Sequence, residues 1–304
     1  MRIASHSIAE VMKRSVAANQ AELNAEQVRI ASGNKHQARS EDCASTARAA
    51  EMQQAQAVSS QFQSNIQQVS TWTSITESRL ISIVDQMARA REIAVEANDA
   101  SLSDGARKAL VTELDGLLED MLSQANASFD GMPVFGGLSG AQPVLETRDA
   151  AGRITGVAYA AGTDSARSVQ VGENATVSCG VSAAGPAGAF ADSTSGRDLF
   201  QSLIDLRDEA GANGSVSSAT LTDLADAFDG ATQALVQTGI QTNRLHTIEQ
   251  QGQSMDVTRQ QSLSDLTDTD MAAAISRLSE LEASLQASMQ LAVAVGRLSL
   301  ADYI

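Results

Sequence analysis

The chain has little of what most thick cores and active sites are built from. Aromatic residues make up 3% of its 304 residues, and it has two cysteines, three histidines and three prolines. Because aromatic side chains supply much of the apolar burial of a thick core, their scarcity favours long helices in narrow contact. Cys43 and Cys179 stand far apart and match no metal or redox spacing, so we expect two unrelated thiols.

Basic residues and long apolar runs are scarce as well. Lys and Arg number 21 against 37 Asp and Glu, and the formal net charge is −16. Nucleic acids and anionic membranes both attract an excess of basic residues, so we expect neither as a partner. No apolar run approaches the roughly 20 residues that span a bilayer. The opening MRIASHSIAEVMKRS lacks the apolar core of a cleaved signal peptide, which leaves the cytoplasm or export without a cleaved signal.

No set of residues indicates catalysis. His6, His36 and His246 lie in remote segments and cannot form a sequence-local metal pair. The acidic stretch LTDTD at 266–270 lacks the glycine and distant glutamate of a calcium loop, and a helix start capped by Asp268 or Thr269 explains it better. We therefore expect no catalytic, cofactor-binding or metal-binding residues and no cofactor, and an enzyme is the weakest candidate.

The prolines divide the chain. They are Pro133, Pro143 and Pro186, and most of the glycines lie in the same middle region. Because proline is excluded from helix interiors, residues 1–130 and 196–304 are free to be helical. The pattern predicts a mainly α fold: a long helical rod or coiled-coil bundle made from both chain ends, with a small β-rich central insert.

Within these flanks the apolar period predicts an opening helix that Gly33 interrupts and helices over about 45–98, 103–127, 197–210 and from 220 onwards, with SLSDLTDTD (262–270) as the break before a terminal helix. The insert alternates apolar and polar residues, and we expect strands at 144–145, 154–159, 169–171 and 177–181. We expect this module to be dispensable for folding of the helical body. The domains predicted are a terminal assembly domain (1–42 with 262–304), a helical rod domain (43–130 with 196–261) and the outer insert (131–195).

Both ends carry a narrow apolar stripe with an average spacing of 3.5 residues, the period of helices that supercoil around a partner. Such a stripe is marginal alone, so it indicates pairing with another helix; an ordinary terminal helix of a bundle is the alternative. Asn19, Glu26 and Ser288 interrupt the stripes, and a buried Asn can fix register at a cost in stability. The expected assembly interface consists of Met12, Val16, Asn19, Leu23, Ile30, Leu278, Leu281, Leu285, Ala292, Val295, Leu298 and Leu300.

The ends of the chain resemble the flagellin superfamily. The likeness lies in MRIASHS, in NQAELNAEQVRIASGNKHQARSED and in the close RLSELEASLQASMQLAVAVGRLSLADYI. The matching positions are Asn19, Gln20, Leu23, Ala31, Ser32, Gly33, Lys35, Ser40, Glu41, Asp42, Leu298, Ser299, Leu300 and Tyr303. Cys43 stands where the family commonly has proline. The block FDGMPVFGGLSG is similar to the entry into the outer domain of the hook–filament junction proteins, the branch that the chain is most like.

This resemblance implies a structural subunit of the bacterial flagellum, outside the cell, exported through the flagellar type III channel without a cleaved signal. The implied partners are further copies of the chain in a ring or tube, a neighbouring hook-associated protein, flagellin and a cytoplasmic export chaperone. Two rivals stay open. One is the bulk flagellin of the filament, and the other is a cytoplasmic helical signalling rod similar to those of chemoreceptors.

Overall fold

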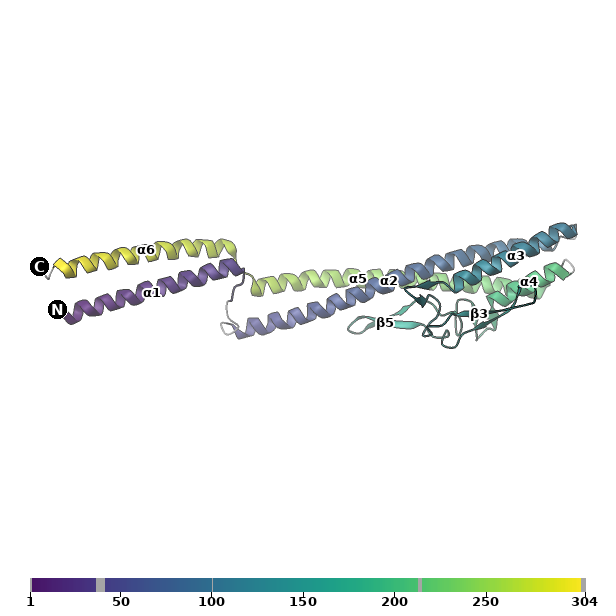
Figure 1. Cartoon of the computed structure of the whole chain (residues 1–304), viewed down its shortest axis with the longest axis horizontal. Coiled ribbons are helices and arrows are strands. Elements are labelled where there is room, and N and C mark those ends of the chain that lie inside the picture. Colours follow the sequence, from purple (N-terminus) through teal and green to yellow (C-terminus); the bar gives the residue numbers. More distant parts are fainter. Residues whose placement is uncertain (1, 37–41, 100, 213–214, 302–304) are drawn as a thin grey trace. The chain divides into compact units, whose positions relative to one another are not determined.

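The computed structural model describes residues 2–36, 42–99, 101–212 and 215–301, without the side chains of 2–9 and 295–301. The fold is mainly helical, with small hairpins in the middle of the chain, as the sequence predicted. Figure 1 shows the elements in order. None of the described helices is long and apolar enough to cross a membrane. The chain divides into two compact units, one of residues 1–58 and 254–304 and the other of residues 59–253. The boundaries of the three predicted domains stay a prediction.

The first unit holds the two terminal helices. Helix α1 (Arg2–Ser32) and helix α6 (Met271–Ala301) pack side by side and run in opposite directions (Figure 1). The unit also contains the start of α2 (Cys43–Ala97) and the end of α5 (Ser218–Thr267). Helix α1 ends where Gly33 takes a φ of +71°, the left-handed conformation that commonly terminates helices and that glycine adopts without a Cβ penalty.

The helix starts show which side chains satisfy the first unpaired amides. Asp42 accepts from the amides of Ala44 and Ser45 at the start of α2. At the start of α6 the cap is Asp270, which accepts from the amides of Ala272 and Ala273 at 2.9 and 3.1 Å. The expectation of Asp268 or Thr269 as this cap is wrong, because α5 continues to Thr267 and the break is shorter than expected.

The second unit is built on α2 and α5, with α3 (Asp104–Ala125) and α4 (Leu199–Ala212) beside them. The side chain of Ser103 accepts from the amide of Ala106 and caps α3. The α2 residues that recur at alternating spacings of three and four are all at least partly buried, which places them on one contacting face. These positions are Ala55, Ser59, Phe62, Ile66, Val69, Thr73, Thr76, Leu80, Ile83, Met87, Ala90 and Ala94. The buried hydroxyls of Thr73 and Thr76 donate to the carbonyls of Val69 and Trp72 in the same helix, so their burial leaves no hydroxyl unsatisfied.

Among the residues that the structure describes, the strands form four antiparallel hairpins. They are β1 (Ser128–Phe129) with β2 (Met132–Pro133), β3 (Val144–Arg148) with β4 (Ile154–Tyr159), β5 (Arg167–Gly172) with β6 (Ala175–Cys179), and β7 (Ala191–Asp192) with β8 (Arg197–Asp198). The four strands expected from the alternating pattern are all present, with somewhat different ends. The segment Asp149–Gly152 forms the turn between β3 and β4.

The insert contributes to the main core of the second unit, which the sequence did not indicate. Phe135 and Phe190 are fully buried, and their rings meet edge to face at a centroid distance of 4.8 Å. Phe190 also meets Phe200 of α4 at 5.7 Å. These rings belong to the same core as Leu80 of α2 and Leu114 of α3. The insert is therefore part of the packed body, and we now expect its removal to destabilise the body, contrary to the expectation from the sequence.

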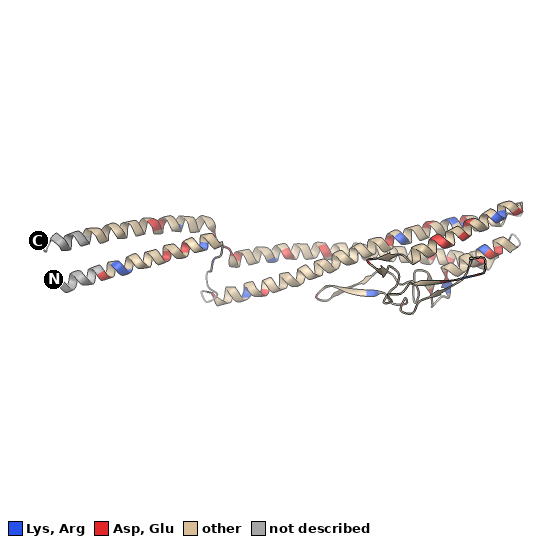
Figure 2. Cartoon of the chain, in the orientation of Figure 1, with Lys and Arg blue, Asp and Glu red and all other residues tan. Residues whose placement is uncertain are grey.

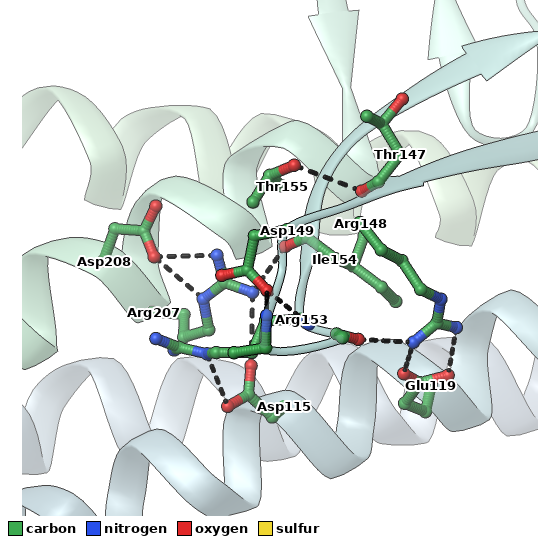
Figure 3. Close-up of polar contacts among 12 residues, drawn as sticks. Asp115, Glu119, Thr147, Arg148, Asp149, Arg153, Ile154, Thr155, Arg207 and Asp208 are labelled. Atoms are coloured by element: carbon green, nitrogen blue, oxygen red, sulfur yellow. Dashed lines mark hydrogen bonds and ion pairs between the residues drawn. The ribbon is translucent and has the colours of Figure 1, made fainter.

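Polar contacts hold the β3–β4 hairpin on α3 and α4 (Figure 3). Arg207 of α4 is 2% exposed and donates from Nη1 to Asp115 of α3 at 3.1 Å and to the carbonyl of Ile154 at 2.6 Å. Arg148 makes a two-point pair with Glu119 of α3, and Arg153 lies 3.3 Å from Asp115. The buried guanidinium thus has an anion and a strand carbonyl as partners, which compensates for its removal from water.

The second large hairpin packs on α2 and α5. Val171 of β5 and Val177 of β6 form a small apolar cluster with Val69 of α2 and Leu245 of α5. The side-chain amide of Asn65 donates to the carbonyl of Gln170 at 2.8 Å.

Candidate assembly interface

The terminal helices bring the predicted interface residues together along one line. Met12, Val16, Asn19 and Ile30 of α1 are partly buried, and Leu23 is 6% exposed. On α6 the corresponding residues, Leu278, Leu281, Leu285 and Ala292, are partly buried. The side chains of Val295, Leu298 and Leu300 lie outside the described residues. We call the facing residues of α1 and α6 the terminal seam.

The seam departs from the expected period at one end. Met271 lies on the same apolar stripe at the start of α6 but is 44% exposed, whereas Ala274 is 4% exposed. Met271 directly follows the cap Asp270, where α6 begins. The apolar contact therefore begins one turn further into the helix.

A polar layer interrupts the seam near its middle. The side-chain amide of Asn19 donates to the hydroxyls of Ser288 at 3.0 Å and Ser284 at 3.2 Å. Ser288 in turn donates to the carbonyl of Ser284 in its own helix at 2.8 Å. Small serine side chains leave room for the longer Asn side chain across the helix pair.

A second polar residue of the seam is paired within its own helix. Glu26 is 5% exposed, and its carboxylate lies 3.2 Å from Nη1 of Arg29. Because a buried carboxylate needs a compensating partner, this pair explains how Glu26 occupies a seam position.

The connecting segments tie the two helices together at the end of α1. The amide of Thr269 donates to the carbonyl of Gly33 at 2.8 Å, and the amide of Lys35 donates to the carbonyl of Thr267 at 2.7 Å. Asn34 and Asp268 thereby form an isolated antiparallel bridge. The pairing of α1 with α6 is thus fixed at this end by backbone hydrogen bonds.

Large apolar residues are exposed to solvent on the outer faces of the helix pair. Exposed fractions are 62% for Val11 and 51% for Val28 on α1, and 59% for Leu291 on α6. Ile275, Met289 and Val293 of α6 are also about half exposed. A two-helix pair has no further layer to cover such residues, so this unit offers apolar surface to neighbouring molecules.

The rest of the described chain shows no arrangement suited to catalysis. It contains no group of three or more His, Cys, Asp or Glu side chains able to hold a metal ion. Cys43 and Cys179 do not form a disulfide. Burial raises the pKa of the Cys179 thiol, which disfavours the reactive thiolate. The ring of His246 forms a hydrogen bond with the side-chain amide of Gln250 in the next helical turn, at 3.0 Å.

The second unit contains a cavity of about 530 Å³ lined mainly by polar residues of α4, α5 and the preceding hairpin. Its aspartates include Asp192, which accepts hydrogen bonds within its own turn, and Asp198, which caps α4. Asp223, Asp226 and Asp229 lie on the exposed face of α5. Figure 2 shows that acidic and basic side chains are spread over the helices. These aspartates are therefore explained by turns, a cap and a solvated helix face.

The paired antiparallel terminal helices, with their apolar seam and exposed apolar outer faces, are typical of a structural assembly protein. Residues 3–139 match the family described as the bacterial flagellin N-terminal helical region.

Individual relatives extend the likeness to nearly the whole chain. "Flagellar hook-associated protein 3" of Escherichia coli strain K12 is 25% identical over 305 residues, which cover 95% of each chain. Among solved structures, the putative flagellar hook-associated protein of Vibrio parahaemolyticus is similar with a TM-score of 0.63 and 19% identity, over 75% of this chain and 100% of that one. FlgL of Xanthomonas campestris is similar with a TM-score of 0.59 and 19% identity, over 70% and 99%.

Proposed function

We propose that this chain is a non-enzymatic structural subunit of the extracellular bacterial flagellum that joins the hook to the filament. The observation that carries this proposal is the terminal helix pair, which buries a narrow seam and keeps large apolar residues exposed on its outer faces. Support comes from the hook-associated relative, which matches over 95% of both chains.

The partners follow from the same surface. The subunit assembles with hook and filament proteins, and its terminal helices pack against further copies of this chain, against a neighbouring hook-associated protein and against flagellin. A cytoplasmic chaperone covers these helices before export, because the exposed apolar residues of α1 and α6 would otherwise promote aggregation.

The seam supplies the test. In Leu281→Asp or Leu285→Asp, an unpaired carboxylate would be buried at the partly covered centre of the seam, which costs several kcal/mol once neighbours exclude water. The second unit has a core of its own, so the variant protein should be made and should fold. We expect cells with either variant to build hooks but to release flagellin into the medium.

The matched control is Glu282→Gln, an exposed position beside Leu281 on the same helix, which should leave motility unchanged. Normal filaments in both Asp variants would contradict the assembly role of α6. Immunogold labelling of intact flagella separates the two flagellar candidates, because a junction subunit gives a band near the hook and a bulk flagellin decorates the whole filament.

A further inference from the structure

We infer that Asn19 determines the register in which α1 pairs with α6, and that Ser284 and Ser288 are its specific partners. This inference rests on the proposed role of the terminal helices in assembly. It assigns to this polar layer, acting together with the backbone bridge at Asn34 and Asp268, the selection of a single pairing among several that an apolar seam would allow.

Without Asn19, the apolar seam would allow α1 and α6 to pair in more than one register. Leu278, Leu281 and Leu285 follow one another at spacings of three and four residues, and Leu23 faces this row from α1. A regular apolar row accepts its partner almost equally well after a slip of one heptad, because the facing side chains are again apolar. Hydrophobic contact alone therefore selects the pairing poorly.

The contact of Asn19 with α6 is directional. Its amide group donates to two hydroxyls on successive turns of α6, at 3.0 and 3.2 Å. A slip of one heptad would exchange Ser284 and Ser288 for Arg277 and Leu281, or for Leu291 and Val295, none of which has a side-chain acceptor, and would leave a partly buried donor unpaired. That loss disfavours the slipped pairing, whereas the native pairing keeps both hydrogen bonds.

The polar layer around Asn19 lies far along α1 from the backbone bridge, which is the other contact that fixes the pair. The backbone bridge at Asn34 and Asp268 holds the helices together only near the end of α1. Asn19 lies about 21 Å further along α1, at 1.5 Å per residue, where no other polar contact between α1 and α6 is found among the described side chains. The two points together define both the axial position and the rotation of the helices.

The consequence concerns assembly. The outer faces carry Val11 and Val28 on α1 and Ile275 and Leu291 on α6. The relative position of these residues on the surface follows the register of the pair. Each subunit then offers the same apolar pattern to its neighbours, as a repeating assembly requires.

Disulfide trapping in the purified full-length chain tests the inference, with Cys43→Ser and Cys179→Ser as the background. The antiparallel direction and the Asn19 contact place Leu23 opposite Leu281, so Leu23→Cys with Leu281→Cys reports the native register. Leu23→Cys with Ala274→Cys reports a slip of one heptad. Trapping also records pairs that form only transiently, so it needs no permanently closed helix pair.

With Asn19 present, we expect the native disulfide to form at least about tenfold faster than the slipped one. In Asn19→Leu this ratio should fall at least threefold, while the terminal helices become more resistant to protease, because a leucine strengthens the seam and removes its selectivity. A ratio that stays the same or rises would overturn the inference.

The partner residues give a second, independent measurement. Ser284→Ala with Ser288→Ala removes both acceptors and should slow formation of the native disulfide several-fold. The matched control is Ser276→Ala with Ser279→Ala, whose hydroxyls bond to carbonyls of α6 itself and should not affect trapping. Equal rates in the two double variants would also overturn the inference. If trapping fails in this way but Leu281→Asp still blocks filament assembly, the proposed function stands without this register role.

Discussion

Nη1 of Arg207 lies 3.1 Å from Oδ1 of Asp115, although the two residues are separated by the whole β-rich insert in the sequence. Arg207 is 2% exposed, and the same nitrogen donates to the carbonyl of Ile154. The pair therefore joins α3, α4 and the β3–β4 hairpin at one buried point (Figure 3).

The first prediction concerns this pair. Asp115→Ala leaves the buried guanidinium with Asp208 and one carbonyl, and we expect the free energy of unfolding to fall by about 2–3 kcal/mol. Arg207→Met removes the buried charge itself and should cost less, because Asp115 keeps Arg153 as a partner and water on its exposed side. Urea unfolding of the purified protein measures both. Asp120→Ala, at an exposed position of the same helix, is the control, and an equal effect of Asp115→Ala and Asp120→Ala would contradict the structural role of the pair.

The second prediction concerns the part of the insert that packs in the core. Phe190→Ala removes a fully buried ring that contacts both Phe135 and Phe200, and we expect a loss of about 3–5 kcal/mol. Leu138→Ala, at a residue of the same insert that is 66% exposed, should be nearly neutral. Replacing 131–195 by a short Gly-Ser linker should abolish cooperative unfolding of the second unit. A deletion variant that melts like the intact protein would show that the insert is independent after all.

The third prediction concerns alkaline pH. The phenol of Tyr159 donates to the carboxylate of Asp198 at 3.0 Å. Burial, and next the negative charge of Asp198, raise the pKa of Tyr159 above its ordinary value near 10. Because the folded state holds this proton more tightly than the unfolded state, the stabilisation is complete below about pH 10 and is lost as the pH rises further.

Tyr159→Phe should therefore lower stability at pH 7 by about 1 kcal/mol through the lost hydrogen bond. The variant should also show a shallower fall of the unfolding free energy between about pH 10 and 11.5. Denaturant unfolding at a series of pH values gives both quantities. An identical slope for the variant and the wild-type chain would show that Tyr159 does not contribute to the alkaline transition.

The helices and their contacting faces could be predicted from the sequence alone. The spacing of apolar residues in α2 repeats over the whole helix, and helix geometry places such residues on one face whatever packs against it. The start of α3 at Ser103 and the end of α1 at Gly33 follow from local hydrogen bonding and backbone conformation, which the neighbouring residues determine. For the same reason the contacting face of α1, from Met12 to Ile30, could be predicted without knowing its partner helix.

Only the tertiary structure decided which distant residues meet. Asn19 was a candidate register residue in the sequence, but its partners Ser284 and Ser288 come from the other end of the chain, and helical period does not specify alignment between two helices. In the sequence Arg207 is indistinguishable from an ordinary exposed helix residue, and only the packing of the β3–β4 hairpin buries it. Phe135 and Phe190 lie in glycine-rich loops without periodicity, so their burial depends on the path of the loops and on the space left between α2, α3 and α4. Local sequence sets backbone conformation and the faces of helices, whereas burial and partner choice depend on how the whole chain fills space.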